Sequence, residues 1–404
     1  MKDLELLAPA GDFEKLKTAF YFGADAAYVG GKNLTLRAFA GNFDNAEMAR
    51  AVRYAHERGK KLYVAVNILA RNSDLGEAAE YFAFLQGIGA DGVIVSDIGL
   101  MNVAKRAAPS LPLHVSTQTS ALNSETVKFY AGFGARRVVL ARELSLKEIA
   151  EIHAAVPETE IEAFAHGAMC IAYSGRCLLS NYLDGRDSNR GACVQPCRWS
   201  YELREKNSAG DFLPVEEDGR GTYILNSKDL NMLDYLGEMA ESGVTSFKIE
   251  GRMKSAYYIA TVVNAYRRAL DSYAAVGKAY KENPLFQSEL GKTAHRAFTT
   301  AYALGDNDKT VNYADSQSRG ERTFAAVVLG YDAAKGRALV EMRNRFKKGD
   351  VLETLSPRET LNAKIEVDGL TDEEGNAVED AKYVQQKLWL YTGVKLEEGD
   401  ILRR

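Results

Sequence analysis

Residues 61–97 read KLYVAVNILARNSDLGEAAEYFAFLQGIGADGVIVSD, and this stretch contains the pattern that decides the fold. The apolar, β-branched run at 61–67 predicts a strand, and apolar residues at helical spacing over 75–86 predict a helix. Residues 92–97 predict the next strand. The stretch is therefore one β-α-β unit.

The same alternation continues outward in both directions through residues 1–276, mostly at intervals of roughly 25–30 residues. Eight β-α units predict a (β/α)8 TIM-like barrel. A doubly wound sheet is the alternative, but Gly30-Gly31 is not a G-x-G-x-x-G turn that opens a helix. The expected strands are 4–8, 26–30, 61–67, 92–97, 113–117, 137–142, 161–165 and 246–250.

Two further parts follow the predicted barrel at 1–276. Residues 277–320 break the periodicity and are expected to be a connector, with 298–302 as a candidate ordered piece. Residues 321–404 carry only strand-like runs separated by glycine turns, which predicts a small C-terminal β-barrel domain. Within the first part, an insertion at about 167–230 leaves the barrel after strand seven.

The composition narrows the class of protein. The net charge of this 404-residue chain is −4, so a nucleic-acid partner would need a local basic patch. No apolar run approaches the roughly 18 residues of a membrane span, and the acidic N-terminus does not resemble a signal peptide. We therefore expect a cytoplasmic protein without a membrane partner, in which clustered cysteines bind metal or catalyse more often than they form disulfides.

All four cysteines of the chain lie inside the insertion, in one window of 28 residues: Cys170, Cys177, Cys193 and Cys197. Four thiolates in one loop-rich window can converge on a tetrahedral metal or an iron–sulfur cluster. The spacing C-x6-C-x15-C-x3-C lacks the C-x2-C of most zinc ribbons and favours a cluster. A structural zinc site and cysteines without metal remain the alternatives.

If the chain forms a barrel, its active site lies at the carboxyl ends of the strands. Glu250, Arg252 and Lys254 follow strand eight, where phosphate or carboxylate often binds. Arg252 and Lys254 are candidates to hold an anion, and Glu250 is a candidate to orient these two cations and a candidate catalytic residue. An internal ion pair is the alternative. The other strand-end residues are Pro9, Gly11, Gly30, Gly31, Asn67, Ser96, Asp97, Thr117, Gln118, Arg142, Glu143 and His166.

Basic and aromatic residues interleave in the cysteine-rich insertion. Arg186, Arg190 and Tyr173 are candidates to grip a phosphate backbone and stack an extruded base, and an ordinary solvated loop is the alternative. A second basic group lies at 343–348 in the C-terminal domain. His166 precedes Cys170 by four residues and is a candidate catalytic base, or a residue that orients the insertion.

Several stretches resemble the motifs of the peptidase U32 family, which was named for collagenase-like proteases. They are LLAPAG at 6–11, EAFAHGAMC at 162–170, YSGRCLLS at 173–180, NSKDL at 226–230 and FKIEGR at 247–252. The resemblance covers essentially the whole chain. One departure is Ala301, which stands where relatives have a glycine after Phe-Thr-Thr.

The resemblance implies an oxygen-independent hydroxylation protein with a 4Fe-4S cluster on Cys170, Cys177, Cys193 and Cys197. Family branches act on tRNA, ribosomal RNA or the ubiquinone ring. With one barrel and a short second domain, this chain is most similar to the tRNA branch, which makes 5-hydroxyuridine at the wobble position and depends on prephenate. Some relatives work in pairs, so an identical or paralogous subunit is an expected partner, beside tRNA and an electron donor that the sequence does not identify.

Three functional hypotheses follow from these observations. The first is an RNA-modifying redox enzyme that takes a target uridine into the barrel mouth. The second is a peptidase that uses Cys170 with His166, which conflicts with a cluster because one cysteine cannot readily serve both roles. The third is an RNA-binding or assembly protein without catalytic activity.

Overall fold

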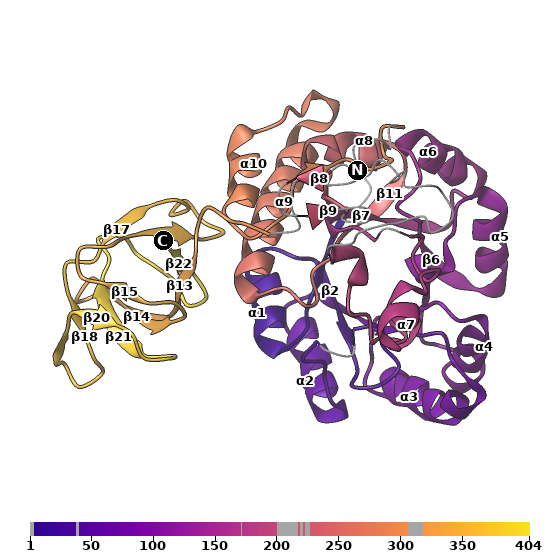
Figure 1. Cartoon of the computed structure of the whole chain (residues 1–404), viewed down its shortest axis with the longest axis horizontal. Coiled ribbons are helices and arrows are strands. Elements are labelled where there is room, and N and C mark those ends of the chain that lie inside the picture. Colours follow the sequence, from indigo (N-terminus) through magenta and orange to yellow (C-terminus); the bar gives the residue numbers. More distant parts are fainter. Residues whose placement is uncertain are drawn as a thin grey trace, which may run out of the picture.

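The computed structural model describes residues 4–37, 40–170, 172–199, 217–218, 221–222, 227–305 and 318–404. Its larger part is a closed barrel of eight parallel strands, which confirms the predicted TIM-like fold (Figure 1). The last strand pairs with both the first and the seventh, which closes the sheet. The barrel strands are β1 (Glu5–Pro9), β2 (Ala26–Gly30), β3 (Lys61–Val66), β4 (Gly92–Val95), β5 (Leu113–Val115), β6 (Ala135–Val139), β7 (Glu160–Ala168) and β11 (Val244–Ile249).

Helices surround the barrel and bury their apolar faces against the strands (Figure 1). Side-chain caps begin two of them: Asp12 accepts a hydrogen bond from the Lys15 backbone, and Ser145 with Glu148 forms a capping box. The surrounding helices are α1 (Phe13–Tyr21), α2 (Asn45–His56), α3 (Leu75–Gly87), α4 (Ile98–Ala107), α5 (Ser124–Phe133), α6 (Leu146–Ala155), α8 (Leu236–Glu241) and α9 (Ala256–Val276).

Two segments differ from the predicted elements. Helical periodicity over about 231–241 predicts a helix there, but the helix begins only at Leu236, because β10 (Asp229–Asn231) pairs antiparallel with the end of β7. The connector contains an unpredicted helix, α10 (Pro284–Gly291), which Asn283 caps and Pro284 starts. It also contains β12 (Phe298–Thr299), which extends the barrel sheet beside β10 and confirms an ordered piece there.

The C-terminal domain is a curled antiparallel sheet whose strand order is β17-β16-β22-β13-β14-β21-β18-β19. Its strands alternate buried and exposed side chains, as in a sheet with one face on a core. The strands are β13 (Phe324–Asp332), β14 (Arg337–Met342), β16 (Val351–Leu355), β17 (Lys364–Glu366), β18 (Leu370–Thr371), β19 (Ala377–Val378), β21 (Lys387–Tyr391) and β22 (Ile401–Arg403), with β15 (Phe346–Lys347) paired to β20 (Asp380–Ala381).

The C-terminal domain packs on α1, α9 and α10 of the barrel part through a buried polar cluster. Arg403 is fully buried and donates to Glu289 at 2.8 Å, to Glu353 at 2.8 Å and to Asn362 at 2.6 Å. Lys292 also reaches Glu289 and Glu353. These contacts join residues from both parts, so the two parts hold a fixed relative position.

Candidate active site at the barrel mouth

A small cavity of about 50 Å³ opens at the carboxyl ends of the strands, where the fold predicts the active site. Its polar groups come from strands on every side of the barrel and from the loop after β2. The lining residues are Tyr28, Leu36, Arg37, Ala65, Asn67, Ile94, Ser116, Thr117, Gln118, Arg142, Phe164, Lys248, Glu250 and Arg252.

Arg252 is the most deeply placed cation of this cavity, with 2% of its surface exposed. Its Nη2 donates to Thr35 Oγ1 at 2.7 Å, whereas its buried Nε has no hydrogen-bond partner among the described residues. Burial and the neighbouring Arg37 lower the pKa of Arg252 to about 10. A buried donor without a partner favours an acceptor brought in by a ligand.

Glu250 is the carboxylate that faces these cations. Arg37 Nη2 lies 3.2 Å from Glu250 Oε1, and the Tyr28 hydroxyl lies 3.2 Å from Glu250 Oε2. Burial would raise the pKa of Glu250, but Arg37, Arg142 and Arg252 together lower it below its usual value. Glu250 therefore carries a negative charge at neutral pH and orients the arginines.

Lys248 forms the floor of the cavity. Its Nζ lies 2.6 Å from Glu162 Oε1 and 4.6 Å from the centre of the Tyr28 ring. Glu162 is fully buried and also pairs with Arg137, which continues the ionic network down the barrel to Glu5. The deeper network, which includes Lys248, is thus paired internally. The cavity itself keeps an excess of positive charge, because Arg37, Arg142 and Arg252 face Glu250.

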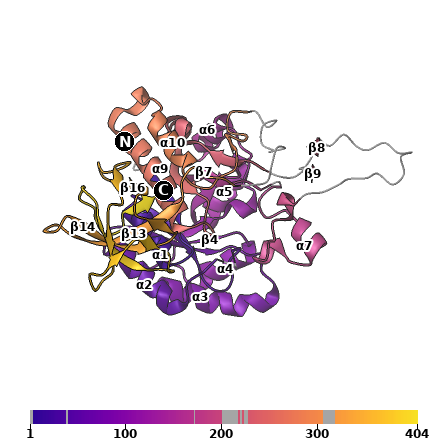
Figure 2. The same ribbon diagram turned by 60° about the vertical axis from the view of Figure 1, so that its left-hand side comes forward.

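The insertion begins directly beside this cavity and projects from the mouth of the barrel with the short helix α7 (Leu179–Asp184) (Figure 2). Arg142 Nη1 donates to Ala168 O at 2.7 Å, and its Nη2 donates to Ser174 Oγ at 3.1 Å. Gly175 lies so close to Gln118 that an added Cβ would approach the Gln118 carbonyl to 2.5 Å. The first turn of the insertion is therefore held against the barrel mouth.

A second anchor holds the far side of the insertion. Arg190 forms a bidentate pair with Asp74 at 2.7 and 3.2 Å and also donates to Leu69 O. The hydrogen bonds from Arg190 and from the Arg71 backbone lower the pKa of Asp74 to about 2. Arg190, predicted as a phosphate ligand, is thus engaged within the chain.

No disulfide joins any of the four cysteines, all of which lie in the described part of the chain, and Cys170 is exposed while the other three are partly exposed. Cys170 is close enough to Arg37 to raise the pKa of that arginine, after the larger effect of Glu250. The Gln195 backbone donates to Cys193 Sγ at 3.4 Å. Across the described part of the chain, no three Cys, His, Asp or Glu side chains gather as ligands of one metal ion. The donor set itself, four cysteine sulfurs with an N–H aimed at Cys193 Sγ, fits iron–sulfur ligation by its chemistry.

His166 does not point into the cavity. A register shift between Lys248 and Ile249 in the pairing of β11 with β7 turns it outward, as β-bulges do. Its Nδ1 lies 3.3 Å from the Tyr266 hydroxyl, and it packs among aromatic rings. Burial lowers the pKa of His166 to about 3, so it is neutral at physiological pH.

Other predicted residues lie outside the cavity. Lys254 does not line it and instead lies over the ring of Tyr258, with 5.1 Å between Nζ and the ring centre. Arg186 pairs with Asp184 on the solvent side of α7, and Tyr173 is 46% exposed. Of the predicted binding residues, the structure thus brings together Glu250 and Arg252, with Cys170 near Arg37.

Sequence reasoning did not single out Arg37 or Lys248. Arg37 lies in a loop after β2 that carries no recognisable motif. Lys248 shares a strand face with Ser246, whose hydroxyl lies in the buried network with Glu5 and Glu162. The two-residue period of a strand could have placed Lys248 inside the barrel.

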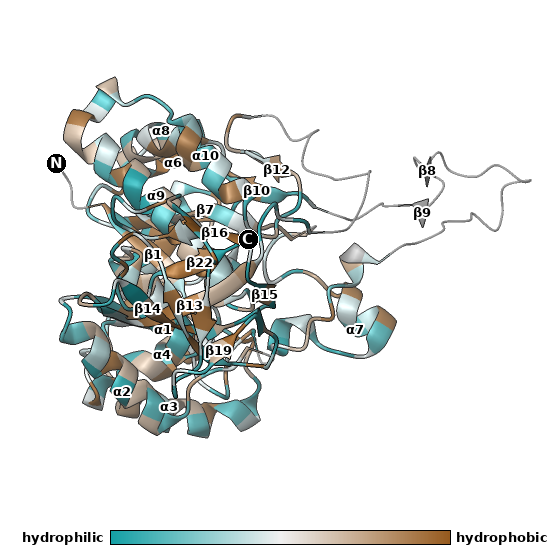
Figure 3. Ribbon diagram, turned by 90° about the vertical axis from the view of Figure 1, so that its left-hand side faces the viewer, coloured by the Kyte–Doolittle hydropathy of each residue, from teal (hydrophilic) through white to brown (hydrophobic). Residues whose placement is uncertain are grey.

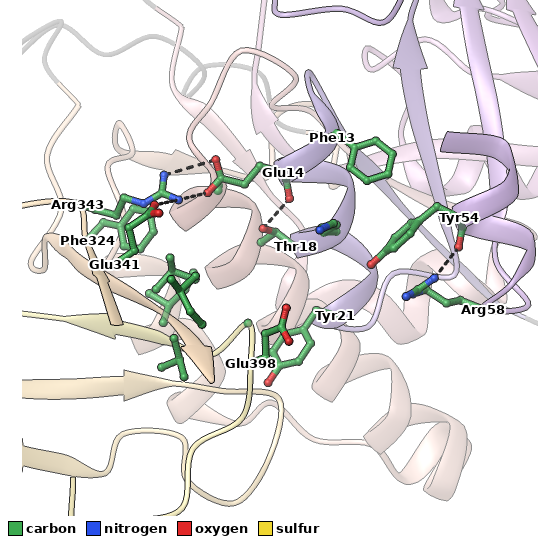
Figure 4. Close-up of a pocket in the computed structure, with 17 residues that line it drawn as sticks. Phe13, Glu14, Thr18, Tyr21, Tyr54, Arg58, Phe324, Glu341, Arg343 and Glu398 are labelled. Carbon is green, nitrogen blue, oxygen red and sulfur yellow. Dashed lines mark hydrogen bonds and ion pairs between the residues drawn. The ribbon is translucent and has the colours of Figure 1, made fainter. Parts of the chain in front are cut away.

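A larger groove of about 560 Å³ lies between the barrel part and the C-terminal domain (Figure 4). Several of its charged residues have partners within the chain: Arg343 contacts Glu14 and Glu341, and Arg58 donates to the Tyr54 backbone. The groove holds none of the predicted site residues. It is therefore part of the domain junction, and the cavity at the barrel mouth remains the candidate active site.

A search of the described helices finds no membrane-spanning candidate.

The family model described as "Peptidase family U32" matches residues 11–313, and the model of its C-terminal domain matches residues 321–403.

Three relatives illustrate what the chain is similar to. The tRNA hydroxylation protein P1 of Bacillus subtilis is 40% identical, and the match covers 100% of this chain and 95% of that protein. The tRNA hydroxylation protein P of Escherichia coli is 35% identical, with 97% and 94% covered. A 23S rRNA 5-hydroxycytidine synthase of Escherichia coli is 33% identical, with 96% of this chain but only 56% of that protein covered.

Proposed function

The chain belongs to peptidase family U32, and from this premise we propose that it is an RNA hydroxylase that converts the wobble uridine of tRNA to 5-hydroxyuridine. The names of the two tRNA hydroxylation proteins and of the ribosomal RNA synthase support hydroxylation of RNA. The match to this chain covers 95% of the Bacillus subtilis tRNA hydroxylation protein but only 56% of the ribosomal RNA enzyme. This chain therefore has the length of the tRNA proteins, which favours tRNA as the substrate. The ribosomal RNA reaction is the alternative.

The observation that carries the proposal is the cation-rich cavity at the barrel mouth beside the cysteine insertion. A base splayed out of an RNA loop can enter a barrel mouth, whereas a base inside a helix cannot be reached. Arg37, Arg142 and Arg252 favour an anionic co-substrate, and prephenate, a dicarboxylate, is the one that the family resemblance implies. The unpartnered Nε of Arg252 is the donor that we assign to one of its carboxylates.

Cys170, Cys177, Cys193 and Cys197 are the residues that we propose to hold a 4Fe-4S cluster. Such a cluster, when bound, supplies one-electron redox chemistry. The chain's own residues would then position the reagents: Glu250 orients Arg37, Arg142 links the insertion to the cavity, and exposed Tyr173 is available to stack on the RNA. A second subunit and an electron donor complete the proposed partners, and the cytoplasm, where tRNA is modified, is the proposed location.

A peptidase is the alternative that the family name suggests, and it needs a nucleophile paired with a base. The candidate pair was Cys170 with His166. His166 is buried with its Nδ1 toward Tyr266, while Cys170 is exposed near Arg37. This geometry favours RNA hydroxylation over peptide hydrolysis.

The deciding experiment is nucleoside mass spectrometry of tRNA from host cells with and without this gene. We expect 5-hydroxyuridine and its derivatives to disappear on deletion and to return with the wild-type gene but not with Cys177→Ala. Arg252→Gln should lower the modification further than Lys254→Gln, which lies outside the cavity. An unchanged tRNA profile in a host without a paralogue would overturn the assignment, and loss of a ribosomal RNA modification would select the alternative.

A further inference from the structure

A cluster of exposed cations lies on the C-terminal domain, around the two-stranded ladder of β15 and β20. We call Arg345, Lys347, Lys348 and Lys382 the basic edge. All four are exposed, and the ladder beneath them is fixed because Phe346 and Ala381, which pair across it, are fully buried in the domain core. The cations therefore sit on a rigid support.

The charge of the basic edge is only partly balanced by its own neighbours. Arg345 holds Asp380 with two hydrogen bonds, and Lys382 and Lys347 are near enough to lower the pKa of that carboxyl as well. Lys348 makes a looser contact of 3.6 Å with Glu379. Lys347 also lies near Asp350, whose carboxylate pairs with Arg404. With that pair included, five cations of the described chain face three carboxylates here, whereas residues 321–404 as a whole contain 16 acidic and 14 basic residues. Positive charge is concentrated here in a domain that is otherwise acidic.

An exposed aromatic ring lies in the same place. Tyr383 is 64% exposed and Val384 is 90% exposed. Their loop is ordered, because Gln386 Oε1 accepts hydrogen bonds from the backbones of Lys382 and Tyr383, and Gln386 N donates back to Tyr383 O. Ordered apolar side chains held in water mark interaction sites, and an aromatic ring among cations is the arrangement that stacks bases beside phosphates.

We propose that the basic edge and Tyr383 form a second RNA contact, which binds the tRNA body while the barrel mouth binds the target base. This inference rests on the proposed function. Figure 3 shows β15 at the edge of the C-terminal domain that faces the same side of the molecule as α7 and the barrel mouth. Because the buried Arg403 cluster fixes the domain, this edge keeps a constant distance from the cavity. One RNA can therefore touch both places.

The test measures binding of full-length substrate tRNA by the intact protein over a range of salt concentrations. The variant Lys347→Gln/Lys348→Gln/Lys382→Gln removes three cations of the edge. The matched control Lys335→Gln/Lys364→Gln/Lys395→Gln removes three exposed lysines elsewhere in the same domain. We expect the edge variant to weaken binding at least tenfold at low salt and to reduce the slope of log affinity against log salt by about 2, while the control changes little.

A second pair of variants tests the aromatic ring. Tyr383→Ala is expected to weaken tRNA binding by roughly tenfold, whereas Tyr383→Phe keeps the stacking face and binds like the wild type.

The kinetics of hydroxylation give a third readout, for the variant that removes three lysines of the basic edge. With saturating tRNA its rate of hydroxylation stays equal to that of the wild type, since the cavity is intact, and the KM for tRNA rises.

The outcomes separate this inference from the proposed function. If the wild type binds and hydroxylates tRNA but the edge and control variants bind equally well, the basic edge is not an RNA contact and the proposed function stands. An acidic protein partner for this edge would give that same result. If the wild type neither binds nor modifies RNA, both proposals are overturned.

Discussion

At the scale of single residues, the candidate site depends on the close approach of the Arg252 side chain to Gly30. Gly30 has no side chain where Arg252 enters the cavity, and a Cβ there would lie 2.6 Å from Arg252 Nη1 and 2.8 Å from Thr35 Oγ1. The Arg252 guanidinium thus has its position because β2 ends in glycine. Ala301 is a different case, a non-glycine residue at φ 49°, where relatives were expected to have glycine.

We predict that Gly30→Ala displaces Arg252 and raises the Kd for an anionic co-substrate by about tenfold, the loss of one charge-assisted hydrogen bond. The measurement is isothermal titration with prephenate. Gly76→Ala is the matched control, because nothing lies within 4 Å of its added Cβ and alanine in α3 should stabilise the fold by about 0.5–1 kcal/mol. Equal affinity in both variants would show that Arg252 does not bind the anion.

The buried histidine at the end of β7 leads to a prediction about pH. The pKa of His166 is lowered to about 3 in the folded protein, against about 6.5 when unfolded. The unfolded chain therefore binds the extra proton, and the free energy of unfolding falls as pH drops from 6.5 toward 3. Between pH 7 and pH 5 the protonation of His166 in the unfolded chain lowers the free energy of unfolding by about 2 kcal/mol.

Urea unfolding at several pH values measures this effect in the wild type and in His166→Phe, which keeps a ring among Tyr258, Tyr266 and Phe298. On going from pH 7 to pH 5, the free energy of unfolding should fall by about 2 kcal/mol less in the phenylalanine variant than in the wild type. Parallel curves for the two proteins would mean that folding does not lower the pKa of His166.

At the scale of elements, the cysteine insertion is attached to the barrel at both ends of its described part. Arg142 and Gln118 hold its first turn, and the pair of Arg190 with Asp74 holds the region between Cys177 and Cys193. These anchors hold the base of the insertion at the mouth, whereas α7 extends away from it (Figure 2). The insertion is thus a supported element at the mouth.

Arg190→Ala should loosen this element. We expect alkylation of Cys177 and Cys193 by iodoacetamide, in protein free of metal, to become about two to five times faster, because a partly exposed bidentate pair contributes up to about 1 kcal/mol. Arg186→Ala is the control, since in the described part of the chain Arg186 pairs with Asp184, a residue of the insertion itself. Mass spectrometry of tryptic peptides gives the rates, and identical rates in both variants would exclude Arg190 as an anchor.

At the scale of the whole molecule, the two parts meet through a buried polar cluster centred on Arg403. Arg403 supplies the cation for Glu289 and Glu353, and stacked rings of Tyr257 and Phe324 lie beside it. Removing one partner of a buried ion pair leaves an uncompensated charge, which costs more than the pair contributes. The domain junction should therefore be sensitive to Arg403.

Arg403→Ala is predicted to lower the free energy of unfolding by about 3–5 kcal/mol and to make the C-terminal domain susceptible to limited proteolysis. The neighbouring Arg404→Ala, which removes an exposed pair with Asp350, should cost less than about 1 kcal/mol. Urea unfolding and protease digestion measure both. If the two variants behave alike, the Arg403 cluster does not hold the domains together.

Much of the architecture is contained in local sequence patterns. The alternation of strands and helices, the caps at Asp12 and Ser145, and the all-β pattern after residue 320 all depend on neighbouring residues, so they could be predicted. The same holds for the cysteine window and for Glu250 and Arg252, because strand ends of a barrel share one face.

The remaining features of the site depend on tertiary structure. Arg37 reaches Glu250 across 213 residues of sequence, and Lys248 faces Glu162 only because the sheet closes on itself. A register shift between β7 and β11 turns His166 outward, and Lys254 lies over Tyr258 of α9 instead of in the cavity. Local sequence patterns determined most of the elements, because periodicity and capping involve neighbouring residues, but they did not indicate α10 or the late start of α8. Only the closed barrel decided which charges meet, because register and long-range pairing set the direction of each side chain.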